Sequence, residues 1–167
     1  ANAIGSVGVP LISNTIKIVD MDTGKELSYD QIGEIWIFAP SAMLGYYKNQ
    51  KETNEVLATD ENGTRWVKTG DLGRMNSDGL LFHEGRIRRI YLTTFEGQPA
   101  KIFPGLIESA VKKLPDVFDC TAVARFRAGS AYYEPVAYVI LHPEHKPLDT
   151  LTKELQRICT KSLPTYM

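Results

Sequence analysis

Short stretches in which apolar and polar positions alternate dominate the first half of the chain, and this period of two predicts β-strands. Turn-forming residues separate the stretches, as in Asn76-Ser77-Asp78-Gly79, where the Asp-Gly pair tolerates positive φ. A short polar helix is expected over 49–57, with Asn49 or Asn54 as a local cap. Strands are predicted at 15–20, 33–38, 65–68 and 80–83, the third ending at Thr69-Gly70-Asp71. Several short strands at close spacing predict a small barrel or sandwich.

Helical spacing of apolar residues appears in the second half, beyond a border near Gly85-Arg86-Ile87-Arg88. A helix is expected to begin at Pro104, whose fixed φ suits a first turn. A last helix is expected to be capped by Asp149 and ended by Pro164. The other segments are predicted as strands at 87–92, 118–126 and 132–141 and as a polar loop at 93–101.

The fold class expected from the two halves is α+β. We predict a small β-barrel-like subdomain over 1–86, followed by a small α+β domain over 87–167 with a three-stranded sheet and helices. A length of 167 residues suits one ordinary domain or two small ones.

Composition and charge then narrow the function classes. Hydrophobic residues make up 43% of the chain and charged residues 23%, which argues against a disordered protein. With a net charge of −1, the chain lacks the overall positive potential that is typical of proteins that bind nucleic acid. No apolar run approaches the roughly 18 residues of a membrane span, and the first residues carry no signal pattern, so a cytoplasmic location is expected.

Cysteine and histidine residues do not predict a metal or redox site. Cys120 and Cys159 make neither a disulfide framework nor a zinc cluster, and they are expected to be buried as small apolar residues. His142 and His145, close to two prolines, are typical of a loop. We therefore expect no metal site in this chain.

The sharpest candidate for chemistry is Lys68-Thr69-Gly70-Asp71-Leu72-Gly73. Its glycines free the backbone to turn closely around another group, and the Asp71 carboxylate at the end of a strand can accept both hydroxyls of a ribose. The same residues also suit an ordinary turn that Asp71 caps by itself. The local sequence leaves both interpretations open.

A basic cluster, Gly85-Arg86-Ile87-Arg88-Arg89, is the second candidate. Arg86 and Arg88 are two residues apart, so on a strand they would share a face that binds a phosphate or a carboxylate. A solvated edge strand protected by charge is the alternative. These residues alone therefore indicate no more than candidate ribose and phosphate contacts at the border of two domains, and no reaction.

Taken together, several segments resemble the adenylate-forming enzymes, a family of acyl-CoA synthetases, aryl-CoA ligases, luciferases and peptide-synthetase adenylation domains. The segments occur in the family's order and cover nearly the whole chain. They are Gly5-Ser6-Val7-Gly8-Val9-Pro10, Gly33-Glu34-Ile35-Trp36-Ile37, Gly45-Tyr46-Tyr47-Lys48-Asn49, Trp66-Val67-Lys68-Thr69-Gly70-Asp71-Leu72-Gly73, Asp78-Gly79-Leu80-Leu81-Phe82, Gly85-Arg86-Ile87 and Leu163-Pro164-Thr165-Tyr166-Met167.

This resemblance implies ATP, Mg²⁺ and a carboxylic acid as reactants, with CoA as the expected acceptor of the acyl group. It implies that Asp71 holds the ribose hydroxyls and that Arg86 supports the same ribose or a nearby phosphate. It places Arg88 at the hinge on which a small C-terminal domain rotates between two half-reactions.

Departures from the family's pattern limit what the chain is expected to do. The family's phosphate loop is absent, and the chain stops before the family's Gly-Lys segment with the adenylation lysine. We therefore expect an inactive C-terminal piece of a larger ligase, with no catalytic residue of its own. The stretch after the hinge, 91–101, is longer than in the family, which leaves the acceptor open. The alternatives are an adenylation domain that loads a carrier protein and a non-catalytic homologue that acts as a binding module.

Overall fold

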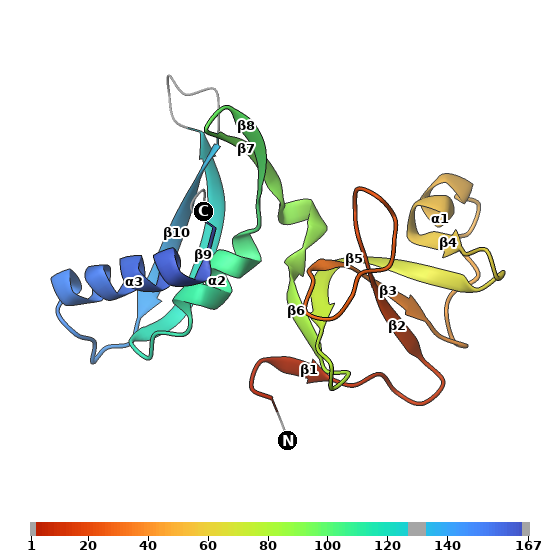
Figure 1. The fold of residues 1–167 in the computed structure, drawn as a ribbon, viewed down its shortest axis with the longest axis horizontal. Helices are drawn as coiled ribbons and strands as arrows, with labels where there is room; N and C mark the ends of the chain where they lie inside the picture. The colour runs from red at the N-terminus through yellow and green to blue at the C-terminus, as the bar shows by residue number, and fades with distance from the viewer. Residues whose placement is uncertain (1–2, 127–132, 165–167) are drawn as a thin grey trace. The chain divides into compact units, whose positions relative to one another are not determined.

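The computed structural model describes residues 3–126 and 133–164 of the chain (Figure 1). The chain forms two compact units: the first ends at Arg88 and the second begins at Arg89. Antiparallel sheets and helices occur in both, so the structure is of a mixed α and β class.

Six strands of the first unit form one antiparallel sheet in the order β1-β6-β5-β3-β2, with β4 paired to β5. The helix α1 precedes β4, and the Asn49 side chain caps it by accepting the Glu52 backbone N–H, one of the two predicted caps. The elements are β1 (Ser6–Gly8), β2 (Thr15–Val19), β3 (Gly33–Phe38), α1 (Gln50–Val56), β4 (Leu57–Thr59), β5 (Arg65–Met75) and β6 (Leu81–Arg86). Because β1 and β2 stand at the two ends of the sheet, closure into a barrel stays a prediction.

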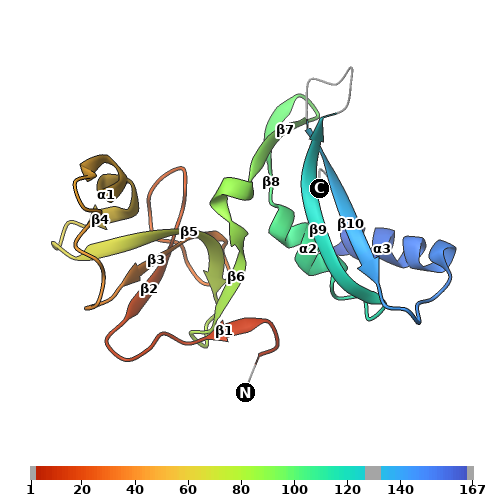
Figure 2. The same ribbon diagram turned by 180° about the vertical axis from the view of Figure 1, so that it is seen from behind.

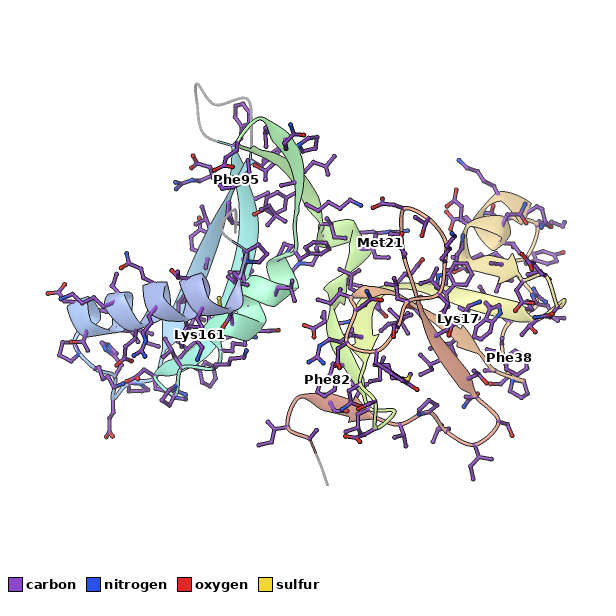
Figure 3. The ribbon with its side chains drawn as sticks, viewed as in Figure 1. Lys17, Met21, Phe38, Phe82, Phe95 and Lys161 are labelled. Atoms are coloured by element: carbon purple, nitrogen blue, oxygen red, sulfur yellow. The ribbon has the colours of Figure 1, made fainter. Side chains whose placement is uncertain are left out.

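Alternation along β2 and β3 divides the sheet into two faces. Ile18 and Ile35 lie opposite each other and pack with Leu81 in the core. The intervening Lys17 lies opposite Trp36 on the other face, and its ammonium stands 4.1 Å from the centre of the Trp66 ring, a cation–π distance (Figure 3). The predicted period of two therefore holds in these two strands.

The sequence predicted that this strand ends at Thr69-Gly70-Asp71. In the structure, β5 continues to Met75. The strand forms a bulge there, since extra residues of β5 stand opposite the step from Glu34 to Trp36 in β3. Gly70 has a φ of 70°, which favours glycine. Side chains satisfy the displaced backbone groups, so the strand bends without stopping.

The second unit contains two separate two-stranded sheets among its described residues, so the predicted three-stranded sheet is wrong. β9 pairs with β10 and β7 pairs with β8. The elements are η1 (Ile87–Arg89), β7 (Tyr91–Phe95), β8 (Gln98–Ile102), α2 (Pro104–Val111), β9 (Val117–Phe126), β10 (Tyr133–Leu141) and α3 (Leu148–Ser162).

The region 93–101, predicted to be a loop, is most of a β-hairpin. Glu96 and Gly97 both have positive φ, 50° and 79°, and such a two-residue turn matches the twist of paired strands. The predicted strand 87–92 begins instead as a turn of 3₁₀ helix, and β7 starts at Tyr91. The backbone N–H and C=O groups of β7 therefore pair with those of β8. A side chain joins β7 to β10, where the Thr93 hydroxyl donates to the Tyr133 carbonyl at 2.9 Å.

The helices α2 and α3 cover one face of the β9–β10 pair (Figures 1 and 2). Pro104 stands in the first turn of α2, as predicted. The last helix is not capped by Asp149: Pro147 is the cap residue and Asp149 lies inside the first turn.

Burial raises the pKa of both cysteine thiols, consistent with a structural role. The core contains Ile102, Ile107, Ala110, Val111, Leu114, Val117, Cys120, Ala122, Leu151 and Leu163.

Candidate functional site

The bulge in β5 positions the first candidate residue, Asp71. The Thr69 hydroxyl donates to the Ile35 carbonyl at 2.8 Å and accepts the Asp71 backbone N–H at 3.0 Å. The Glu34 carboxylate accepts the Gly70 backbone N–H at 3.1 Å. Asp71 therefore projects from a bulge that two side chains hold in place, rather than from the free end of a strand.

Asp71 and Arg86 lie directly opposite each other in the β5–β6 ladder, so the structure brings these two predicted residues together. Arg86 Nε is 3.0 Å from Asp71 Oδ1. Asp71 Oδ1 is buried, whereas a quarter of the whole side chain (25%) stays exposed, and Arg86 is 63% exposed. The pair thus joins a shielded anion to a cation that solvent or a ligand can reach.

Arg88, the third predicted residue, does not share a strand with Arg86. Arg86 is the last residue of β6, and Arg88 lies in the 3₁₀ turn η1. A common basic face on one strand is therefore excluded, because the alternation of a strand stops before Arg88.

Arg89, which the sequence analysis included in the basic cluster without giving it a role, is held firmly within the second unit. Its guanidinium donates to both carboxylate oxygens of Glu108, at 2.6 and 3.1 Å, and to the Ala122 carbonyl at 3.1 Å. Glu108 also accepts the Ala122 backbone N–H at 2.8 Å. Burial raises the pKa of the Glu108 carboxyl, but the hydrogen bonds from Arg89 and Ala122 outweigh burial and hold this pKa below its usual value.

His83 is a residue of this site that the sequence did not point to. Its Nε2 atom lies 3.5 Å from Asp71 Oδ1. It stands three positions before Arg86, and on a regular strand residues at this spacing face opposite sides. No pattern in the local sequence indicated that His83 would join the pair.

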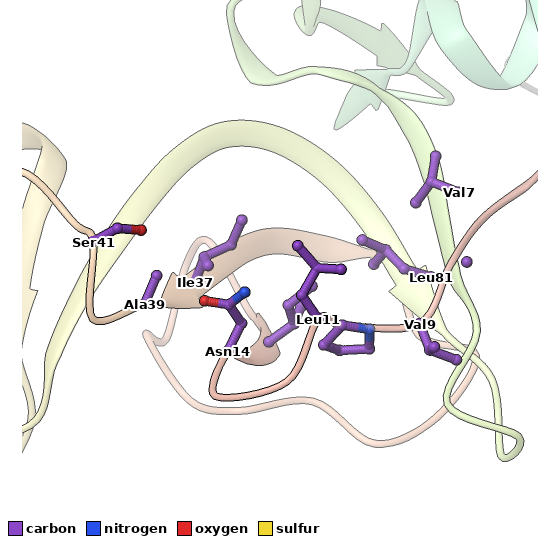
Figure 4. A pocket seen from close by; sticks show the side chains of 11 residues that line it. Val7, Val9, Leu11, Asn14, Ile37, Ala39, Ser41 and Leu81 are labelled. Atoms are coloured by element: carbon purple, nitrogen blue, oxygen red, sulfur yellow. The ribbon is translucent and has the colours of Figure 1, made fainter.

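An apolar pocket of the first unit, with a volume of ≈ 330 Å³, has none of these charged residues in its lining (Figure 4). Val7, Leu11, Ile37 and Leu81 are among its lining residues, and none of the lining residues ionises. Within residues 3–126 and 133–164, no cluster of His, Cys, Asp and Glu suits a metal ion. Over the same residues, no helix is long and apolar enough to span a membrane.

Comparisons with known proteins agree with one another. The family model of the AMP-binding enzymes matches residues 1–47. The chain is 33% identical over 156 residues to 4-coumarate--CoA ligase-like 8 of Arabidopsis thaliana, which covers 90% of this chain and 26% of that relative. It is 31% identical over 162 residues to 4-coumarate--CoA ligase-like 4 of Oryza sativa subsp. japonica, which covers 97% of this chain and 27% of that relative.

Solved structures share the fold over nearly all of the chain. The amide bond synthetase McbA from Marinactinospora thermotolerans superposes with a TM-score of 0.76 and 26% identity, covering 95% of this chain and 30% of that protein. The anthranilate CoA ligase AuaEII in complex with anthranoyl-AMP superposes with a TM-score of 0.71 and 27% identity, covering 97% of this chain and 29% of that ligase.

The fold and the matched segments therefore place this chain in the class of the AMP-binding enzymes. The chain belongs to the adenylate-forming enzyme superfamily. It spans about a quarter of the length of the curated relatives that it matches.

Proposed function

We propose that this chain is the C-terminal part of an ATP-dependent acid–thiol ligase that acts in the cytoplasm. The carboxylate of the acid attacks the α-phosphorus of ATP and displaces pyrophosphate. A thiol, with CoA as the proposed acceptor, then attacks the acyl carbon and displaces AMP. The names of the relatives, which are CoA ligases, and the anthranoyl-AMP bound to one of the similar structures support this reaction.

The observation that carries the proposal is the Asp71–Arg86 pair on the bulged strand. An exposed part of the Asp71 carboxylate accepts the ribose hydroxyls, while the 3.0 Å contact with Arg86 keeps the shielded oxygen oriented. Arg86, largely exposed, supports the same ribose or a nearby phosphate. Neither residue transfers a proton or forms a covalent bond, so their role is nucleotide binding.

Mg²⁺ bound to ATP would neutralise charge on the transferring phosphates. We assign no residue of this chain to that ion. Within this chain, the proposal therefore concerns the nucleotide alone.

The domain boundary, 1–86 and 87–167, and the hinge at Arg88 are also proposals. The network of Arg89, Glu108 and Ala122 supports them, because it ties the chain to the second unit immediately after Arg88. Because Arg89 is fixed to the second unit, a rotation between the domains would change φ and ψ only at Ile87 and Arg88. A small domain that rotates about such a linker serves two half-reactions in turn.

Pyrophosphate release by the full-length protein tests the reaction. A panel of carboxylic acids is offered with ATP, and CoA or a simple amine is then offered as the acceptor. We expect acid-dependent release of pyrophosphate, and an acyl thioester when CoA is present. No release with any acid would contradict the proposed activity. An amide without a thioester would contradict CoA as the acceptor. The 167-residue chain alone should exchange no pyrophosphate into ATP.

A further inference from the structure

Asp71 Oδ1 is a buried carboxylate oxygen that accepts no hydrogen bond among the described residues. Two nitrogen atoms nevertheless stand close to it: Arg86 Nε at 3.0 Å and His83 Nε2 at 3.5 Å. A shielded carboxylate oxygen without a donor is costly, so a small adjustment that completes either contact is favoured. The arrangement places this oxygen between two donors.

A second bulge, in β6, creates this arrangement. In the β5–β6 ladder, Asp71 pairs with Arg86 and Leu72 with Gly85, but Gly73 pairs with His83. One extra residue of β6, Glu84, is therefore unpaired, and the register shifts by one. Because of this shift, His83 and Arg86 lie on the same face as Asp71, although they are three positions apart in the sequence.

We propose that His83 is a nucleotide-positioning residue. It holds the shielded oxygen of Asp71 from one side while Arg86 holds it from the other, so that the remaining oxygen stays oriented toward the ribose hydroxyls. This inference rests on the proposed function. It assigns to His83 a part in choosing nucleotides that carry ribose hydroxyls, and it does not require His83 to touch the nucleotide.

Exposure sets the expected size of the effect. His83 is 46% exposed and Arg86 is 63% exposed, so water screens both contacts. Loss of the His83 contact should therefore weaken ribose recognition about two- to fivefold, less than loss of Asp71 itself. A glutamine at position 83 keeps an N–H donor at the reach of the imidazole Nε2, and leucine removes it.

Calorimetric binding of two nucleotides to the full-length protein tests the inference: AMP, and 2′,3′-dideoxy-AMP, which lacks both hydroxyls. The measured quantity is the ratio of their dissociation constants in the wild type, His83→Leu, His83→Gln and Asp71→Asn. His145→Leu is the matched control, because His145 is an exposed histidine of the second unit.

We expect the wild type to prefer AMP, Asp71→Asn to lose the preference, His83→Leu to lose about two- to fivefold of it, and His83→Gln to keep most of it. In the Asp71→Asn background, His83→Leu should have no further effect. No preference in the wild type, or an unchanged preference in Asp71→Asn, would overturn the ribose role of Asp71, and this inference would fail with it. If Asp71→Asn loses the preference but His83→Leu keeps it, the inference alone fails. Equal weakening of both nucleotides by His83→Leu would also overturn it, because that marks a general structural role.

Discussion

The two units differ in how the backbone N–H and C=O groups of their sheets are hydrogen-bonded. In the first unit, β5 is interrupted by a bulge and β6 by another, and side chains such as Thr69 and Glu34 accept or donate where the ladder does not. In the second unit, β9 and β10 pair residue by residue from Tyr133 to Ile140, and helices cover one face.

This difference separates binding from anchoring. A bulge re-aims side chains, and the charged residues that we assign to the nucleotide lie at or beside the bulges of β5 and β6. The regular ladder of the second unit supports a rigid body, to which Arg89 attaches the chain through Glu108. Irregular strands therefore carry the proposed chemistry, and the regular ones carry the proposed moving part.

The largest expected effect is the loss of the Asp71 carboxylate. In the full-length protein, Asp71→Ala should weaken ATP handling about ten- to a hundredfold, because a hydrogen bond to a charged group contributes roughly 1.5–3 kcal/mol. Pyrophosphate exchange measured against ATP concentration checks this. Asp78→Ala, in the turn before β6, is the control and should behave as wild type. Wild-type kinetics for Asp71→Ala would contradict a role for Asp71 in ATP binding and would leave the bulge with a structural role only.

Next comes the proposed hinge. Arg88→Pro fixes φ at position 88 near the value of a 3₁₀ turn, and it disfavours the helical φ and ψ of Ile87, the residue that precedes it. Fewer backbone conformations of Ile87 and position 88 therefore remain accessible. In the full-length protein, one half-reaction should therefore slow far more than the other, as measured by separate assays of adenylate formation and thioester formation. Arg88→Ala, which keeps backbone freedom, should slow neither. Equal rates in Arg88→Pro would place the hinge elsewhere.

A smaller effect is expected at the anchor of the second unit. Arg89→Ala leaves the Glu108 carboxylate, with only 16% of its side chain exposed, without its bidentate partner. We expect the second unit to lose about 1–3 kcal/mol of stability, and Arg89→Lys to recover only part of it, because an ammonium cannot bond both oxygens in one plane. Amide exchange in α2 and β9 measures this loss. Protection equal to wild type in Arg89→Ala would show that the clamp is not needed for folding.

The smallest effect concerns acid. Hydrogen bonds lower the pKa of the Asp60 carboxyl in the first unit, the main donor being Trp66. In the second unit, hydrogen bonds from Lys146 lower the pKa of the Asp116 carboxyl, and a hydrogen bond from Lys112 lowers that of Asp119. The pKa of the Glu108 carboxyl is also lowered.

A carboxyl with a lowered pKa in the folded state stabilises above its unfolded pKa, and this contribution disappears as the pH falls through the folded value. Below about pH 4, the second unit should therefore lose stability more steeply than the first. Both tryptophans lie in the first unit, so their fluorescence follows it alone, and amide exchange in α3 follows the second. Asp60→Asn should flatten the acid response of the first unit only. A steeper loss in the first unit would contradict the assignment.

Local sequence determined the elements whose cause is local. The alternation in β2 and β3, the Asn49 cap of α1 and the Pro104 start of α2 each depend on residues within a few positions, and each was predicted. The motif around Asp71 also identified the candidate residue, although its shape was predicted as the end of a strand.

Only the tertiary structure decided what surrounds Asp71. The bulge of β5 is held by Glu34 and Ile35, more than 30 positions away along the chain, and His83 reaches Asp71 only because the β5–β6 register shifts by one. The hairpin β7–β8 replaced an expected third strand because its two-residue turn lets β7 pair locally. Register and bulges depend on which strand satisfies which backbone group, and that pairing is settled between segments that are distant in the sequence.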